Sequence, residues 1–290
     1  MLTIFIAGGT GMLGSSLCKY LRKLKYNVVV HGFENKADIM IDMTDEATVA
    51  KSLDQVNPDI IVNLVCLSDV DRNEIEHNLA YQLNVKPVEN IAHWIKNQNR
   101  DIQFIQISTD HLYDSDGLNQ EKNVICRNTY ATTKYQADQI ALDADASVLR
   151  TNFFGKSQNK NRQSFSDWIE SNVANNIPMS LFHDVYFSPL SMQTLIKMIV
   201  HVIENYQPGI FNLGSRKGMS KSEFAYKLII NMHEKDLSLT KISVEDIGFT
   251  ALRPKGMMMD VSKFEKYFGI TLPTLESEIN THRRSTNNKL

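Results

Sequence analysis

A tyrosine and a lysine four residues apart carry the strongest chemical signal in the sequence. Tyr130-Ala-Thr-Thr-Lys134 falls in a segment with a helical pattern, so the two side chains share one helix face. A phenol is a weak acid at neutral pH, but an ammonium group one turn away stabilises its phenolate. Such a pair can deliver a proton to a carbonyl oxygen while hydride reaches the carbon, and Lys134 can also hold a nicotinamide ribose. Because the same spacing occurs in ordinary amphipathic helices, the interpretation needs companions.

One companion is the polar segment Ile107-Ser108-Thr109-Asp110, which ends an apolar run typical of a strand. Open α/β sheets bind their ligands at the carboxyl ends of their strands. Thr109 precedes Tyr130 by 21 residues and can donate a hydrogen bond to a substrate carbonyl. A Ser/Thr/Asp turn after a strand is common in a purely structural role, so the inference depends on both segments together.

A second companion is a glycine-rich turn near the N-terminus. Gly8, Gly11 and Gly14 form G-x-x-G-x-x-G between the first predicted strand and the first predicted helix. Glycine permits a tight turn, close approach of the backbone to a pyrophosphate, and close packing of the helix on the strand. The helix N-terminus then offers free N–H groups and a positive dipole end to phosphates. Gly9 with Gly11 and Gly14 also fits G-x-G-x-x-G, so the turn predicts nucleotide binding without selecting a family.

The elements that must position these residues follow from the hydrophobic pattern. Apolar runs at 3–7, 27–30, 59–64, 103–107 and 147–150 alternate with helical patterns, including one at 74–97 and one at 130–143. Continuous apolar strands separated by helices predict an α/β protein with a doubly wound parallel sheet, a Rossmann fold. We expect residues 1–150 to form the NAD(P)-binding domain.

After residue 150 the regular alternation of apolar runs and helical patterns ends. Residues 151–290 are expected to form mainly a smaller C-terminal substrate-binding domain, with some segments returning to the main sheet. Ser220-x-x-Glu223 predicts a capping box that opens a helix. The polar last ten residues are expected to fray.

Composition excludes several classes of function. A formal net charge of -2 gives no reason to expect nucleic acid or an acidic membrane surface as partner. Cys18, Cys66 and Cys126 contain no C-x-x-C pair, so neither a disulfide framework nor a zinc site is indicated. No apolar stretch approaches the roughly 18 residues of a membrane helix. We expect a cytoplasmic protein with no membrane partner, and the sequence leaves a homodimer open.

With these motifs in place, the sequence resembles the extended short-chain dehydrogenase/reductase superfamily, and within it most the dTDP-4-dehydrorhamnose reductase family. The resemblance runs over nearly the whole chain. It is carried by GGTGMLGSSL (8–17), NPDIIVN (57–63), LAYQLNV (79–85), ISTDHLYD (107–114), NTYATTKYQAD (128–138), SKSEFA (220–225) and LRPKG (252–256).

The resemblance implies NAD(P)H-dependent reduction of the 4-keto group of a nucleotide-activated 4-keto-6-deoxy sugar, as in dTDP-rhamnose biosynthesis. It makes Tyr130 the proton donor, Lys134 its partner, and Thr109 a residue that tunes the tyrosine and touches substrate. Asp110 would contact the sugar, and Phe153 stands where the family has a substrate-side tryptophan. Besides Tyr130 and Lys134, the residues expected to line the cofactor are Gly8, Gly11, Met12, Leu13, Gly14, Asp42, Met43, Leu64, Val65, Cys66 and Leu67.

The sequence also departs from the family. Leu64-Val65-Cys66-Leu67 replaces a small, usually alanine-rich segment, which predicts a narrower cofactor cleft. His111 follows Thr-Asp where the family has tyrosine. Some members use a glutamate near the first helix for a bridging metal, but Ser16 stands there, so no metal is predicted.

The end of the second predicted strand bears on the choice of cofactor. No acid stands at its tip, where an NAD-specific site would grip both ribose hydroxyls. His31 and Lys36 would lie near a 2′-phosphate, whereas Glu34 would argue for NADH by reaching the ribose. NADPH is therefore favoured, with NADH accepted.

Two other functions remain open. One is a sugar-nucleotide epimerase or dehydratase of the same fold. The other is a non-catalytic, NADP-binding regulatory subunit resembling that of methionine adenosyltransferase, since a fold does not guarantee an activity. The joint presence of Thr109, Tyr130 and Lys134 favours catalysis.

Overall fold

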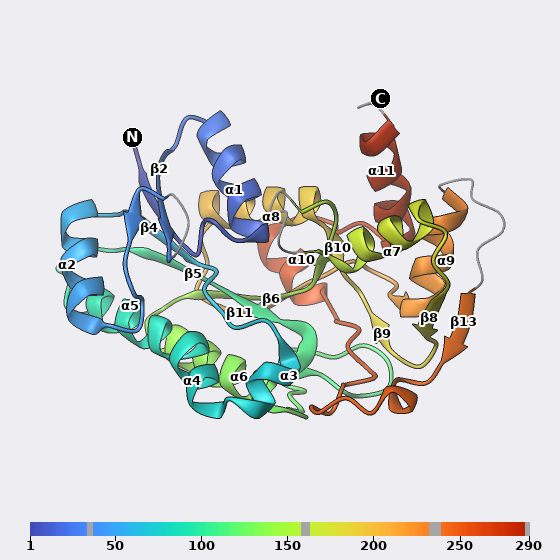
Figure 1. Cartoon of the computed structure of the whole chain (residues 1–290). Helices are drawn as coiled ribbons and strands as arrows, with labels where there is room; N and C mark the ends of the chain where they lie inside the picture. The colour runs from blue at the N-terminus through green and yellow to red at the C-terminus, as the bar shows by residue number, and fades with distance from the viewer. Residues whose placement is uncertain (34–36, 158–162, 232–238, 288–290) are drawn as a thin grey trace. The chain divides into compact units, whose positions relative to one another are not determined.

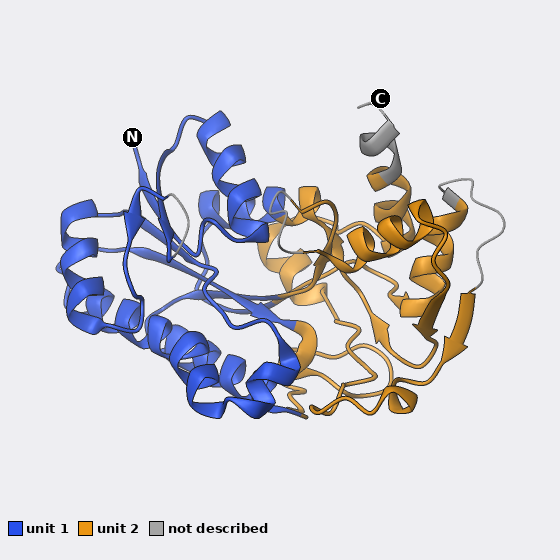
Figure 2. Ribbon diagram, in the orientation of Figure 1, with its two compact units in different colours: residues 1–109, 128–150, 196–211 blue, residues 110–127, 151–195, 212–290 orange. Residues whose placement is uncertain are grey.

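A computed structural model describes residues 1–33, 37–157, 163–231 and 239–287 of the chain. The chain divides into two compact units, coloured separately in Figure 2. The first unit comprises residues 1–109, 128–150 and 196–211, and the second comprises 110–127, 151–195 and 212–290. The chain therefore passes between the units several times, whereas the sequence analysis expected one main boundary at residue 150 with some later segments returning to the main sheet.

The first unit is built on a seven-stranded sheet in the order β11-β6-β5-β4-β1-β2-β3. The pairings β2 with β3, β1 with β2, β1 with β4 and β4 with β5 are parallel. This is the doubly wound architecture predicted from the sequence. The order in which successive strands are added along the sheet reverses between β1 and β4. Its elements are β1 (Thr3–Ala7), α1 (Met12–Lys23), β2 (Asn27–Gly32), β3 (Ile39–Met40), α2 (Glu46–Val56), β4 (Ile60–Asn63), α3 (Val70–Ile75), α4 (His77–Asn84), α5 (Lys86–Lys96), β5 (Gln103–Thr109), α6 (Thr129–Leu142) and β6 (Ser147–Thr151), with parts of α8 (Met192–Glu204) and β11 (Gly209–Leu213).

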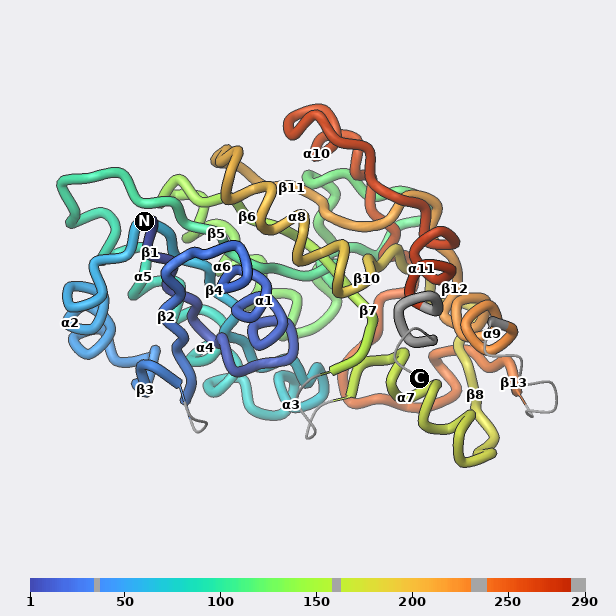
Figure 3. The backbone as a smooth tube through the Cα atoms, turned by 90° about the horizontal axis from the view of Figure 1, so that it is seen from above, coloured from blue at the N-terminus to red at the C-terminus, as the bar shows by residue number. Residues whose placement is uncertain are grey.

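Helices cover both faces of this sheet, because its central strands are apolar on both sides. Figures 1 and 3 show α1 on one side of the sheet and α4 and α6 on the other. Leu17 and Leu21 of α1 are fully buried. On the opposite face, α2, α5 and α6 share one core cluster with β1, β4 and β5, which includes Phe5, Leu53 and Phe104.

One helix expected from the sequence is three helices in the structure. The segment predicted as 74–97 is divided into α3, α4 and α5, with breaks at Glu76 and Val85. Pro87 lies in the first turn of α5, where its missing N–H costs nothing, but it disfavours helical geometry in the residue before it. Asp69 caps α3 by accepting a hydrogen bond from Arg72 N (3.0 Å). The helical spacing of the apolar residues continues through these breaks, so the sequence pattern alone did not reveal them.

The second unit has short strands and its own core. β8 pairs with β13 and β7 with β10 in parallel, and β9 pairs with β12 antiparallel. Phe154, Phe187 and Phe224 are buried in its core cluster. Its elements are η1 (Asp110–Leu112), β7 (Phe153–Phe154), α7 (Phe165–Ala174), β8 (Met179–Phe182), β9 (Tyr186–Phe187), β10 (Leu190–Ser191), β12 (Met219–Ser220), α9 (Lys221–Asn231), β13 (Leu239–Ile242), η2 (Val244–Ile247), α10 (Ser262–Phe268) and α11 (Leu275–Asn287).

Two expectations about helix ends can be compared with the structure. The capping box at α9 is confirmed, because Glu223 N donates to Ser220 Oγ (3.2 Å) and Ser220 N donates to the Glu223 carboxylate (2.9 Å). Residues 281–287 of the segment expected to fray continue α11, and 288–290 lie outside the described residues, so fraying of this end stays a prediction. Within the described ranges, no helix combines the length and the apolar character needed to cross a membrane.

Candidate functional site

The glycine turn lies between β1 and α1, beside the point where the strand order reverses. Gly8 has φ +74°, in the left-handed region that favours glycine. A Cβ on Gly14 would lie 2.6 Å from Gly8 O, so α1 approaches the turn as closely as the sequence analysis expected. Gly11 provides no side-chain cap and the first turn of α1 holds no acidic residue. The helix N-terminus therefore suits the pyrophosphate of a dinucleotide.

Tyr130, Lys134 and Thr109 lie in the first unit on adjoining elements. Tyr130 and Lys134 are one turn apart on α6, and Thr109 is the last residue of β5. All three are buried. Lys134 Nζ donates to Ile107 O (2.8 Å), which ties α6 to the end of β5. An ammonium group can donate three hydrogen bonds, so this anchor leaves capacity for a ribose or a phenol.

The start of α6 is fixed by two caps. Asn128 Oδ1 accepts from Ala131 N (2.9 Å), and the Glu74 carboxylate of α3 accepts from Thr129 N (2.8 Å). Tyr130 is the second residue of this doubly capped turn. Its backbone position is therefore held at both ends of the first turn.

Behind Lys134 lies a buried ion pair that the sequence analysis missed. Arg150 Nε of β6 donates to Asp138 Oδ2 of α6 (2.8 Å), and both side chains are at most 1% exposed. Burial raises the pKa of the Asp138 carboxyl, whereas Arg150, Ser108 and Lys134 lower it. Asp138 follows Lys134 by four residues, a spacing that shows it shares the face of the Tyr130–Lys134 pair.

An amide network, also missed, links the segment after β4 to α6. Leu67 N donates to Asn84 Oδ1 (2.7 Å), and Asn84 Nδ2 donates to Thr133 Oγ1 (2.9 Å) and to Asn73 Oδ1 (2.8 Å). Asn84 has no exposed surface. The only sign of this network in the sequence is an asparagine within an otherwise helical segment, and an asparagine alone does not reveal which residue it bonds to.

The other residues expected to line the cofactor fall into two groups. Gly8, Gly11, Met12 and the segment Leu64–Leu67 are half-buried, and a Cβ on Gly8 would lie 3.1 Å from Val65 N, so the two loops adjoin. Leu13, Gly14 and Met43 are buried, and Met43 belongs to the core cluster, while Asp42 is exposed. Their contact with a cofactor stays a prediction.

The prediction that His31 lies near a 2′-phosphate is wrong. The ring is only 3% exposed, and both of its nitrogens have partners. Val30 and His31 continue β2 to Gly32, so the ring is held within the sheet and does not extend from its tip. Glu34 and Lys36, which the same prediction invoked, lie outside the described residues.

Asp110 and Phe153, expected to contact substrate, belong to the second unit. The Asp110 carboxylate is fully buried and accepts from Asn152 Nδ2 (2.7 Å). Phe153 is half-buried in β7, whereas its neighbour Phe154 is 1% exposed and packs against Phe224. A contact of either residue with a sugar stays a prediction.

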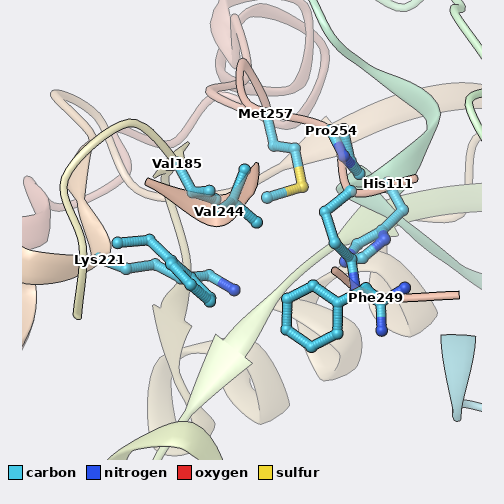
Figure 4. A pocket seen from close by; sticks show the side chains of 9 residues that line it. His111, Val185, Lys221, Val244, Phe249, Pro254 and Met257 are labelled. Carbon is cyan, nitrogen blue, oxygen red and sulfur yellow. The ribbon is translucent and has the colours of Figure 1, made fainter. Parts of the chain in front are cut away.

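The second unit contains a pocket that the sequence analysis did not anticipate. Figure 4 shows Lys221 reaching into it from one side, with His111 and Phe249 on the other. The cavity measures about 180 Å³. Its lining residues are His111, Phe182, Val185, Lys221, Val244, Phe249, Arg253, Pro254 and Met257.

The pocket combines positive charge with aromatic walls. Arg253 lies 4.4 Å from the ring centre of Phe249, and Lys221 Nζ lies 5.9 Å from that of Phe182. Burial, Lys221 and Arg253 lower the pKa of His111 to about 3, so the imidazole is neutral near pH 7. Burial lowers the pKa of Lys221, Asp110 opposes this, and Arg253 adds to it. Such a pocket favours an anion attached to a flat or apolar group.

Comparison with known proteins places this geometry in a family. A probable low-salt glycan biosynthesis reductase, Agl14, of Haloferax volcanii is 27% identical over 288 residues, covering 95% of each chain. A dTDP-4-dehydrorhamnose reductase of Aggregatibacter actinomycetemcomitans is 25% identical, covering 93% of this chain and 94% of its own. The crystal structure of a dTDP-4-dehydrorhamnose reductase from Bacillus anthracis in complex with NADP has a TM-score of 0.88 at 23% identity, covering 98% of this chain and all of that one.

The family described as RmlD substrate binding domain matches residues 2–286, nearly the whole chain. The resemblance inferred from the motifs is thereby confirmed. The chain belongs to the RmlD substrate binding domain family.

Proposed function

We propose that the protein reduces the 4-keto group of a nucleotide-activated 4-keto-6-deoxy sugar with NADPH, as dTDP-4-dehydrorhamnose reductases do. The observation that carries this proposal is the arrangement of Tyr130, Lys134 and Thr109 at the junction of α6 and β5, with Lys134 anchored to Ile107 O at 2.8 Å. The relatives named as reductases and the NADP complex of a structural neighbour support it.

In the proposed mechanism NADPH, when bound, supplies the hydride to the carbonyl carbon. Thr109 donates a hydrogen bond to the carbonyl oxygen and Tyr130 transfers its phenolic proton to that oxygen, so the ketone becomes an alcohol. Lys134 stabilises the resulting phenolate, and the buried Asp138–Arg150 pair holds the neighbouring part of α6 against β6. The glycine turn binds the cofactor pyrophosphate at the start of α1.

The pocket of the second unit supports a nucleotide-linked substrate. Lys221 and Arg253 suit the charges of a diphosphate, and Phe182 and Phe249 suit the face of a base. This matches the substrate class that the family resemblance implies, but it selects neither the base nor the sugar.

The test is turnover on a panel. Purified protein is incubated with NADPH and with dTDP-, UDP- and GDP-linked 4-keto-6-deoxy sugars, while the absorbance of NADPH is followed and the product is identified by NMR. The matched control is the corresponding nucleotide sugar without the keto group. We expect stoichiometric loss of NADPH and formation of the 4-hydroxy sugar with at least one member of the panel.

Three results would contradict the proposal in different ways. Conversion of a 4-keto-6-deoxy sugar without net consumption of NADPH would indicate an epimerase, whereas conversion of a nucleotide-linked hexose that keeps its 6-hydroxyl to a 4-keto-6-deoxy sugar would indicate a dehydratase. Tight NADPH binding with no conversion of any member would favour the regulatory-subunit alternative.

A further inference from the structure

His31 occupies an unusual place between two segments expected to line the cofactor. Its Nδ1 lies 3.1 Å from Gly8 N in the glycine turn, and its Nε2 lies 3.0 Å from Ile41 O, next to Asp42. Its own carbonyl accepts from Gly9 N (2.8 Å). Besides its pairing within the sheet, His31 therefore makes these three hydrogen bonds, two of them to the glycine turn.

The partners determine the tautomer of the ring. Gly8 N is a donor, so Nδ1 must be the unprotonated acceptor, and Ile41 O is an acceptor, so Nε2 must carry the hydrogen. Burial lowers the pKa of His31, while Ile41 O and Asp42 oppose this shift. The neutral ring with hydrogen on Nε2 satisfies both partners without leaving a buried group unpaired.

The contact with Gly8 matters because that amide belongs to the turn itself. Gly8 adopts φ +74°, and its carbonyl accepts from Gly11 N (3.0 Å), so the residue whose N–H meets His31 also holds Gly11, the residue that precedes α1. A ring fixed at its far nitrogen by Ile41 O gives the Gly8 N–H a rigid acceptor.

We infer that His31 is a positioning residue for the cofactor site, which holds the glycine turn in its phosphate-binding conformation and couples it to the Ile41–Asp42 segment. It acts through Gly8 and touches no reacting atom. The inference depends on the proposed use of a dinucleotide cofactor, but it does not depend on turnover.

The experiment measures NADPH binding by fluorescence titration, with no sugar present. His31→Phe keeps a ring but removes both nitrogens. Losing the one hydrogen bond to Gly8 N should raise its Kd for NADPH about tenfold, the upper range for a single hydrogen bond. His31→Asn places an acceptor near the position of Nδ1 and should recover most of the affinity. His31→Gln can reach Ile41 O but not Gly8, so it should resemble His31→Phe. Val29→Ala, on the same strand and packed against the core cluster, is the matched control for lost packing.

A pH series adds a readout that packing alone would not change. The groups that face the His31 ring are Gly8 N, Ile41 O and the ring of Phe5. The charged group that affects the pKa of His31 is Asp42. Below its lowered pKa, a protonated Nδ1 would oppose the Gly8 N–H, so wild-type affinity should fall as the pH drops through that pKa, which lies below the ordinary value of 6.5. The 2′-phosphate itself titrates near pH 6, so the decisive quantity is the ratio of wild type to His31→Asn at each pH.

The outcomes separate cleanly. Recovery by His31→Asn but not by His31→Gln, with a ratio that changes under pH 6.5, supports the inference, and it still does so if His31→Phe fails to fold. Equal affinity in all variants, or equal loss in His31→Asn and His31→Gln, would overturn it. Wild-type protein that binds no NADPH would instead refute the proposed cofactor, whereas binding without turnover would leave His31 in its role and refute only the proposed reaction.

Discussion

The glycine turn of the first unit and the pocket of the second differ in how they are built. The turn uses backbone N–H groups within one short stretch, braced by His31 from the adjacent strand. The pocket uses side chains from positions as far apart as His111, Lys221 and Arg253. A site made of backbone in a short stretch shows itself as a motif, whereas a site made of distant side chains does not.

The two regions also handle charge differently. The turn offers the partial charge of a helix end and no charged side chain in its first turn. The pocket holds two cationic side chains around a neutral imidazole. Changes in the first unit should therefore affect the cofactor and the chemical step, and changes in the pocket should affect the sugar nucleotide.

The largest effect is expected at Tyr130. Tyr130→Phe removes the proton donor and keeps the ring, so kcat should fall by about 10²–10⁴-fold while the Kd of NADPH changes little. Steady-state kinetics and a cofactor titration measure both. Tyr135→Phe, which removes a hydroxyl from the same helix, is the matched control. A Tyr130→Phe rate within about threefold of wild type, far inside that range, would show that another group is the acid.

A smaller effect is expected in the pocket. Lys221→Met should raise KM for the nucleotide sugar by about 10- to 100-fold, because charge-assisted hydrogen bonds contribute roughly 1.5–3 kcal/mol. The Kd of NADPH should stay unchanged. Lys227→Met, on the same helix but in an exposed ion pair with Glu276, is the control. If NADPH binding fell as much as sugar binding, the division of roles between the two regions would be wrong.

The smallest kinetic effect is expected at Phe153. Phe153→Ala should raise KM for the sugar several-fold and lower stability less than Phe154→Ala, since Phe153 is half-buried and Phe154 is 1% exposed. Truncating the buried ring should cost about 3–5 kcal/mol of unfolding free energy. Denaturant titrations of both variants provide the comparison. A Phe153→Ala protein with normal kinetics but the larger loss of stability would assign Phe153 to the core.

Much of the first unit was predictable because its signals are local. The order of strands and helices follows from apolar runs and helical periods, and the turn at Gly8–Gly14 follows from steric limits on the backbone. The Tyr130–Lys134 pair is local too, because helical geometry alone puts residues four apart on one face. The break at Val85 was missed because the apolar period continues across it.

What only the tertiary structure decided depends on contacts between residues far apart in the chain. Nothing in the sequence pairs Asp138 with Arg150, brings Asn84 to Thr133, or turns His31 from a supposed phosphate contact into a brace for Gly8. The pocket likewise exists only once η1, β8 and α9 pack together. Local sequence limits backbone angles and periodicity, but a buried polar side chain takes whichever partner the packed chain brings within hydrogen-bonding distance.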